Sequence, residues 1–128
     1  MAGPVENAIR GRVSEGITLR TAARGAGFRV ERIDGQGVVL LLGAKRAWTR
    51  IPWQALEAAP SFLANRGWVP LGGARIVEGQ PGTFDEHLKK WVKRDIANYV
   101  AALLARARIV DLDPNPPAKL RLREDWGS

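Results

Sequence analysis

The sequence contains no cysteine and a single histidine. The absence of cysteine excludes disulfides and thiolate metal sites, and it favours an intracellular, cytoplasmic protein. One histidine excludes metal centres that need several imidazole ligands. The aliphatic run VVLLL at 38–42 is too short to cross a bilayer, and the N-terminal residues lack the apolar core of a secretion signal. We therefore expect no membrane association.

Recognisable catalytic and cofactor motifs are also missing. There is no glycine-rich phosphate loop with the Lys-Ser/Thr that such loops need. Asp111 and Asp113 alternate in a predicted strand and could share a divalent cation with Asp34 or Glu78. Two acids beside a turn are, however, ordinary surface residues. We predict a protein that is not an enzyme, with no catalytic residue, no metal and no cofactor.

Positive charge is the most informative property of the composition. Twenty Lys and Arg face thirteen Asp and Glu, which gives a net charge of +7 and an isoelectric point near 10.8. The excess is concentrated in residues 1–66, which hold ten cations and five anions. This balance is typical of proteins that bind nucleic acid. A GC-rich genome would also enrich arginine, so charge alone does not decide the function.

Period-two hydrophobicity predicts a small antiparallel β-meander over about 17–51. Short alternating segments at 17–20, 28–33 and 46–51 flank the apolar strand 38–42, and a DGQG turn at 34–37 suits a hairpin. Residues 1–16 contain three glycines and a proline and are predicted to form a flexible arm. Pro52 is expected to start a short helix that Pro60 breaks. The segments 68–71 and 74–77 are predicted to be extended, as a second hairpin.

One long amphipathic helix is predicted over about 84–107. Thr83 and Glu86 have the spacing of a capping box, and apolar residues recur at steps of three and four from Phe84 to Leu104. After it, 109–113 and 119–123 alternate on either side of PNPP and form a C-terminal β-hairpin. The expected fold is α+β. Residues 17–128 would form one domain, or two modules joined near 78–82, with Trp53, Trp68 and Trp91 in a shared core.

A helix, the strand 109–113, the proline-rich loop 114–117 and the basic strand 119–123 loosely resemble the end of a winged helix, in which the hairpin is the wing. The resemblance covers about the last third of the chain and implies DNA binding. A helix-turn-helix is the related alternative, with a helix at 84–92, a turn at 93–96 and a recognition helix from Ala97. In that arrangement Asn98, Ala101, Ala102 and Arg106 would face a major groove.

A cation–aromatic–cation row is the most specific binding feature of the sequence. In RAWTRI, residues two apart share one face of a strand, so Arg46, Trp48 and Arg50 are predicted to point outward, opposite Ala47, Thr49 and Ile51. Such a row offers stacking to bases and charge to phosphates. The alternative is that Trp48 packs beneath the helix and both arginines are solvated. The second basic feature is a predicted helix face formed by Lys89, Lys90, Lys93 and Arg94, which nearby acids could neutralise.

We therefore predict a non-catalytic nucleic-acid-binding protein of a prokaryote or phage, with DNA favoured over RNA as the partner. The predicted binding residues are Arg20, Arg24, Arg29, Lys45, Arg46, Trp48, Arg50, Lys89, Lys90, Lys93 and Arg94. The alternative function is a protein–protein interaction module, such as an adaptor, an inhibitor or an accessory subunit, because Trp and Arg commonly anchor protein partners.

Overall fold

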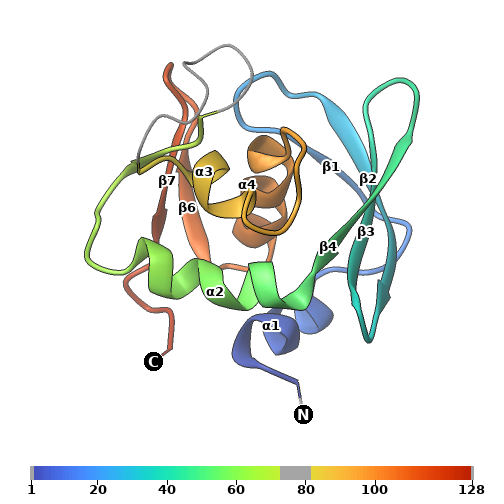
Figure 1. The fold of residues 1–128 in the computed structure, drawn as a ribbon, viewed down its shortest axis with the longest axis horizontal. Helices are drawn as coiled ribbons and strands as arrows, with labels where there is room; N and C mark the ends of the chain where they lie inside the picture. The colour runs from blue at the N-terminus through green and yellow to red at the C-terminus, as the bar shows by residue number, and fades with distance from the viewer. Residues whose placement is uncertain (1, 73–81, 128) are drawn as a thin grey trace.

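The computed structural model describes residues 2–72 and 82–127 and has the predicted α+β architecture (Figure 1). Two antiparallel sheets enclose helices α3 and α4, and helices α1 and α2 lie along one end of the molecule. In chain order the elements are α1 (Pro4–Arg12), β1 (Thr18–Arg20), β2 (Gly27–Asp34), β3 (Gly37–Leu42), β4 (Ala47–Pro52), α2 (Trp53–Leu63), β5 (Val69–Pro70), α3 (Phe84–Leu88), α4 (Ala97–Arg106), β6 (Val110–Asp113) and β7 (Lys119–Leu122).

The predicted meander is confirmed as the sheet β1-β2-β3-β4, in which each strand pairs with the next. The turn between β2 and β3 is held by the Asp34 carboxylate, which accepts hydrogen bonds from the Gln36 and Gly37 amides. Strand β3 is the central apolar strand, and only Leu41 among its leucines and valines is more than marginally exposed. Phe28 and Val30 of β2 face the core as expected.

The predicted C-terminal hairpin is also confirmed, since β6 and β7 pair from Val110–Leu122 to Asp113–Lys119. Strand β5 adds to the other edge of β7 and completes a three-stranded sheet. Residues 74–77, the expected hairpin partner of 68–71, lie outside the described residues. Most of the expected module boundary at 78–82 lies there too. Buried side chains from both sheets and all four helices belong to one hydrophobic cluster.

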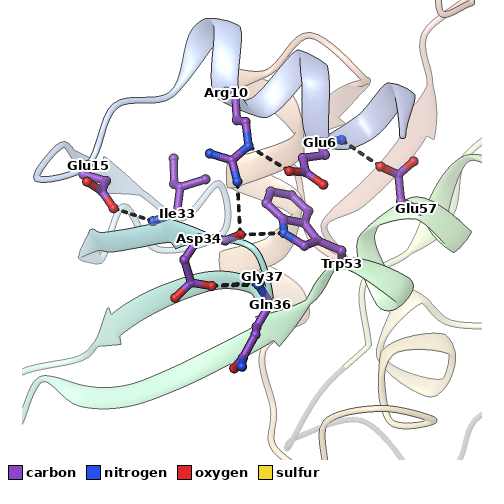
Figure 2. Close-up of polar contacts among 9 residues, drawn as sticks. All are labelled: Glu6, Arg10, Glu15, Ile33, Asp34, Gln36, Gly37, Trp53 and Glu57. Carbon is purple, nitrogen blue, oxygen red and sulfur yellow. Dashed lines mark hydrogen bonds and ion pairs between the residues drawn. The ribbon is translucent and has the colours of Figure 1, made fainter. Parts of the chain in front are cut away.

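The prediction of a flexible arm over 1–16 is wrong for residues 4–12, which form α1 (Figure 2). Proline at the first helical position and two fully buried side chains, Val5 and Ile9, fix this helix. Its N-terminus has no local cap. Instead the Glu57 carboxylate of α2 accepts hydrogen bonds from the Val5 and Glu6 amides, at 3.1 and 2.8 Å. The sequence signal was weak because the capping group is far away in the chain.

Helix α2 is continuous, so the expected break at Pro60 does not occur. Pro52 precedes the first residue, as predicted, and Pro60 lies within the last turn. A proline in the last turn removes only one backbone hydrogen bond, and the helix ends three residues later at Leu63. The helix terminates through Asn65 and Gly67, both with positive φ. Of the residues that the sequence predicts to be buried in this helix, Trp53, Leu56 and Leu63 are buried and Phe62 is partly buried; Ala55 and Ala59 are buried as well.

The prediction of a single long helix over 84–107 is wrong, because the structure has two helices there, α3 and α4. Thr83 caps α3 as predicted by accepting a hydrogen bond from the Glu86 amide. After Leu88 the backbone forms tighter turns, because the amides of Lys90 and Trp91 donate to carbonyl groups three residues earlier in the chain. The apolar stripe is nevertheless buried, because α3 packs on α2 while α4 packs between the two sheets. Periodicity therefore identified the buried residues and not the break between the helices.

The recognition helix of the helix-turn-helix alternative begins at Ala97, as that alternative required. Its proposed groove-facing residues do not form an exposed face, however, since Ala101 and Ala102 are buried against the rest of the protein. Among the three tryptophans expected in the core, Trp53 is buried, whereas Trp68 and Trp91 are 40% and 38% exposed. The described segments contain no helix with the length and apolar character that crossing a bilayer would require.

Candidate nucleic-acid interface

The strand containing Trp48 has the predicted orientation. Thr49 and Ile51 are buried on the core side of β4, while Trp48 and Arg50 point to the opposite side of the sheet. Trp48 is 55% exposed, so the alternative in which it packs beneath a helix is wrong. The helices all lie on the core side of this sheet in Figure 1. We call the other side, which carries Trp48 and Arg50, the outer face.

Cross-strand pairing aligns the outer face in two rows. In the first, Arg29 of β2, Leu41 of β3 and Trp48 of β4 are successive partners. In the second, Arg32, Val39 and Arg50 are successive partners. Val39 is fully buried although it does not belong to the hydrophobic core cluster. The aliphatic stems of the flanking arginines, Arg32 and Arg50, are the neighbours that can cover it.

Arg32 belongs to this face but was missed from the sequence. Strict alternation from Phe28 and Val30 would turn Arg32 toward the core. The register of β2 shifts between Val30 and Arg32, which is a β-bulge, and the extra residue turns Arg32 outward. An arginine at a position that alternation assigns to the core was the only sequence signal of this bulge.

One end of the meander gathers four of the predicted cations. The β1–β2 and β3–β4 turns lie at the same end because consecutive strands are antiparallel. Arg20 and Arg24 flank or occupy the first turn, and Lys45 and Arg46 occupy the second. Arg20 donates to the Gly25 carbonyl at 2.9 Å. The positive φ of 51° at Arg46 places it in the turn and not in the strand, a small correction to the predicted row.

A shallow hollow of about 350 Å³ lies at this end of the outer face. It is lined by Arg29 and Arg46, by Leu41 from the first row, and by the backbone of glycines such as Gly43. Two predicted binding residues thus approach one concave surface from neighbouring hairpins.

Two cations of the outer face have acidic neighbours. Arg29 pairs with Glu31 at 3.2 Å, and both side chains are largely exposed. Arg50 pairs with Asp34 at 3.1 Å, and its guanidinium lies 5.4 Å from the centre of the Trp48 ring. The hydrogen bond from the Gln36 amide, with help from the Arg50 charge, lowers the pKa of Asp34. The exposed Arg29–Glu31 pair contributes about 0–1 kcal/mol, so a phosphate can compete for Arg29.

The predicted basic helix face does not exist as one surface, because the helix that would carry it is divided. Lys89 is bound to Asp85 and Asp95, at 2.9 and 2.7 Å, and these hydrogen bonds, led by the one to Asp95, raise its pKa. The Lys93 ammonium donates to the Lys89 carbonyl. Lys90 is exposed. Much of this charge is therefore neutralised within the α3–α4 connection, as nearby acids allowed.

Arg94 connects the two predicted basic regions. Its guanidinium donates to the Thr49 hydroxyl at 2.7 Å and lies 3.5 Å from the Trp48 carbonyl oxygen. The α3–α4 connection is thereby fastened to β4, the edge strand next to Trp48. Arg94 acts as a structural link beside the outer face more than as a free cation.

An aromatic cluster around His87 was also missed. His87, the single histidine, is only 4% exposed; its ring is stacked on that of Phe62, with 4.5 Å between the centroids, and edge-on to that of Trp91, with 5.0 Å. Burial, aided by the charge of Lys90, lowers the pKa of His87. Its Nε2 atom has no hydrogen-bond partner among the residues that the structure describes. The division of the helix explains the error, because α3 turns His87 toward α2.

The acidic residues considered as metal ligands are paired with cations instead. Asp111 contacts Arg121 and Arg123, and Asp113 contacts Lys119. Asp34 lies in the other sheet, and Glu78 falls outside the described residues. Within residues 2–72 and 82–127, no three His, Asp or Glu side chains are grouped as metal ligands would be.

Comparison with known proteins adds no assignment to this geometry. No protein-family model, no curated protein and no solved structure matches the chain.

Proposed function

We propose that this protein binds nucleic acid without catalysis, through the outer face of the β1–β4 sheet, with DNA the first ligand to test and RNA the second. The observation that carries the proposal is the exposed Trp48, aligned with Arg29 across the sheet and flanked by Arg50. An aromatic ring among cations on an open β-sheet combines base stacking with phosphate neutralisation.

The charge of the surface supports this proposal. Six cations lie on the outer face and the β3–β4 turn, at Arg20, Arg29, Arg32, Lys45, Arg46 and Arg50, against the acids Glu31 and Asp34. Lys45 and Arg46 are exposed and contact no carboxylate of the described residues, so phosphate can reach them without breaking an existing pair. We expect these two residues to contribute most to the salt dependence of binding.

The test removes their charge and keeps a polar side chain at each position. Fluorescence anisotropy would compare the wild type with Lys45→Gln/Arg46→Gln on labelled DNA and RNA at several salt concentrations. The plot of log affinity against log salt should be linear, and its slope should fall in magnitude by roughly 0.7–0.9 for each lost phosphate contact. Arg12→Gln/Arg106→Gln is the matched control, since both arginines are exposed on the helices. Equal binding by the two double variants would refute the proposed surface.

The protein-interaction alternative draws on a second exposed pair. Trp68, in the segment before β5, lies 4.5 Å from the Arg121 guanidinium of β7. Exposed tryptophan beside arginine is typical of interface hot spots. A complex with a protein that resists salt and is lost in Trp68→Ala, with no oligonucleotide binding, would favour this function.

A further inference from the structure

We infer that the ligand of the outer face is a single strand, with an unpaired base stacked on the Trp48 ring. This inference rests on the proposed function and concerns its substrate class. It combines three features of the described residues: the accessibility of the ring, the number of cations around it, and the lack of a helix presented for a groove.

The ring of Trp48 is accessible in a way that suits an unpaired base. It is 55% exposed, and the Arg50 guanidinium covers part of it at 5.4 Å from the centroid. Arg50 is held by Asp34 and by Gln36, at 3.1 and 2.7 Å, so its position beside the ring is fixed. A base in a duplex has both faces stacked already, whereas an unpaired base can use an aromatic ring as its stacking partner.

The number of cations also fits a short single strand. Six cations and two acids leave the outer face and the β3–β4 turn with a net charge of +4. Four to six phosphates correspond to a few nucleotides, within the range of about 4–16 nucleotides covered by single-strand-binding folds.

No described helix presents a face for a major groove. Helix α4 lies between the two sheets, and Ala101 and Ala102 on its proposed reading face are buried. Helix α2 carries no Lys or Arg. In α1, Arg10 is engaged by Glu6 and by the Asp34 carbonyl oxygen. Duplex readers usually place a helix or a β-ribbon in the groove, so a duplex would have to be read here by one of the hairpins.

The hollow beside the first row provides a place for the neighbouring nucleotide. Leu41 separates Trp48 from Arg29 in that row and also lines the hollow. Its volume of about 350 Å³ is at the lower end of the range of about 300–1,000 Å³ for small-ligand pockets. A strand whose one base stacks on Trp48 can place the next residue here, with its phosphates between Arg29 and Arg46.

The decisive experiment compares one sequence in two forms. Fluorescence anisotropy would measure the affinity of the protein for a DNA of about 12 nucleotides, once as a single strand and once annealed to its complement, at the same ionic strength. We expect the single strand to bind about tenfold more tightly or better. Equal or tighter binding of the duplex overturns this inference while the proposed function stands. Binding of neither form, nor of the corresponding RNA, overturns both.

Trp48 variants locate the effect. Trp48→Ala should weaken single-strand binding by about 5- to 100-fold, the range for loss of one stacked base, and leave duplex binding unchanged. Trp48→Phe should retain binding but lose the tryptophan quench caused by the oligonucleotide. Trp68→Phe is the matched control and should keep both the binding and the quench. A single-strand preference that persists in Trp48→Ala, with thermal unfolding unchanged, would overturn the assignment of stacking to Trp48.

Discussion

Replacement of Glu57 should detach the N-terminal helix. The Glu57 carboxylate accepts from the amides of Val5 and Glu6, which are the second and third residues of α1, so it does what a local capping side chain does elsewhere (Figure 2). Loss of a cap costs about 0.5–2 kcal/mol, and hydrogen bonds to a charged group are at the upper end of their range. We expect Glu57→Ala to lower the free energy of unfolding by about 1.5–3 kcal/mol, from these two contributions.

Chemical denaturation followed by circular dichroism would measure this loss. Glu57→Gln should lose about half as much, since the amide oxygen still accepts one hydrogen bond but carries no charge. Glu124→Ala is the matched control, because Glu124 is exposed and caps no helix. Surface substitutions of that kind change stability by about 0.5 kcal/mol or less. A Glu57→Ala protein as stable as Glu124→Ala would refute the capping role.

Gly3 provides an independent test of the same contact. A Cβ atom at Gly3 would lie 2.4 Å from the Glu57 carboxyl carbon, and its φ of −78° causes no strain by itself. Gly3→Ala should therefore displace the carboxylate and destabilise the protein by a similar amount. The double variant Gly3→Ala/Glu57→Ala should be less destabilised than the sum of the single variants, because both remove one interaction. Full additivity would contradict a shared cause.

Three further predictions concern stability. Burial lowers the pKa of His87 below 6.5, so the unfolded chain binds the proton more readily than the folded protein. The free energy of unfolding should therefore be highest above about pH 6.5 and fall on acidification. Urea denaturation at about pH 7.5 and 5.5 would measure this fall, which His87→Phe should reduce. Gly37→Ala should cost about 3 kcal/mol or more, since its Cβ would lie 2.1 Å from a carbonyl oxygen of β4, whereas Gly35→Ala meets nothing within 4 Å and should cost at most about 1 kcal/mol. A double-mutant cycle of Arg94→Ala and Thr49→Val should give a coupling of about 1 kcal/mol; no coupling would mean that this hydrogen bond does not fasten the α3–α4 connection.

The sheet regions could be predicted because burial in a strand is a local, period-two property. Thr49 and Ile51 point inward and Trp48 and Arg50 outward in both the prediction and the structure. Arg32 shows the limit of this reasoning. A single inserted residue reverses every later assignment in a strand, and the bulge that does so in β2 depends on pairing with β3.

Helix boundaries were less predictable because distant groups set them. Helix α1 depends on Glu57, more than fifty residues away in the chain, and lacks a capping side chain of its own. Lys89 holds the connection between α3 and α4 by bridging two aspartates, and Arg94 fastens it by a hydrogen bond to Thr49 of the edge strand β4. Apolar periodicity describes which residues are buried, and it is the same whether the buried stripe lies on one helix or on two that pack against different partners.

At the proposed interface, too, the residue type alone does not show which neighbours the fold provides. Lys89 and Lys45 are both lysines in a basic run, yet Lys89 is bound by two carboxylates, whereas Lys45 lies exposed in a turn and pairs with no acid of residues 2–72 and 82–127. Sequence counts them equally, because net charge carries no information about which neighbours the fold provides. Under the proposed function, the cations on the meander are therefore better placed to meet phosphate than those on the α3–α4 connection.

The exposure of Trp48 is not required by the fold. An outward position on an edge strand needs only a residue that tolerates extended backbone, and threonine or valine would satisfy it. More than half of the Trp48 surface remains in water, next to an arginine held by two polar groups. Local structure thus explains where the ring points but not why a tryptophan is there. Contact with a ligand that buries its face would explain the residue type, which is why substitution at this position is the most direct test of function.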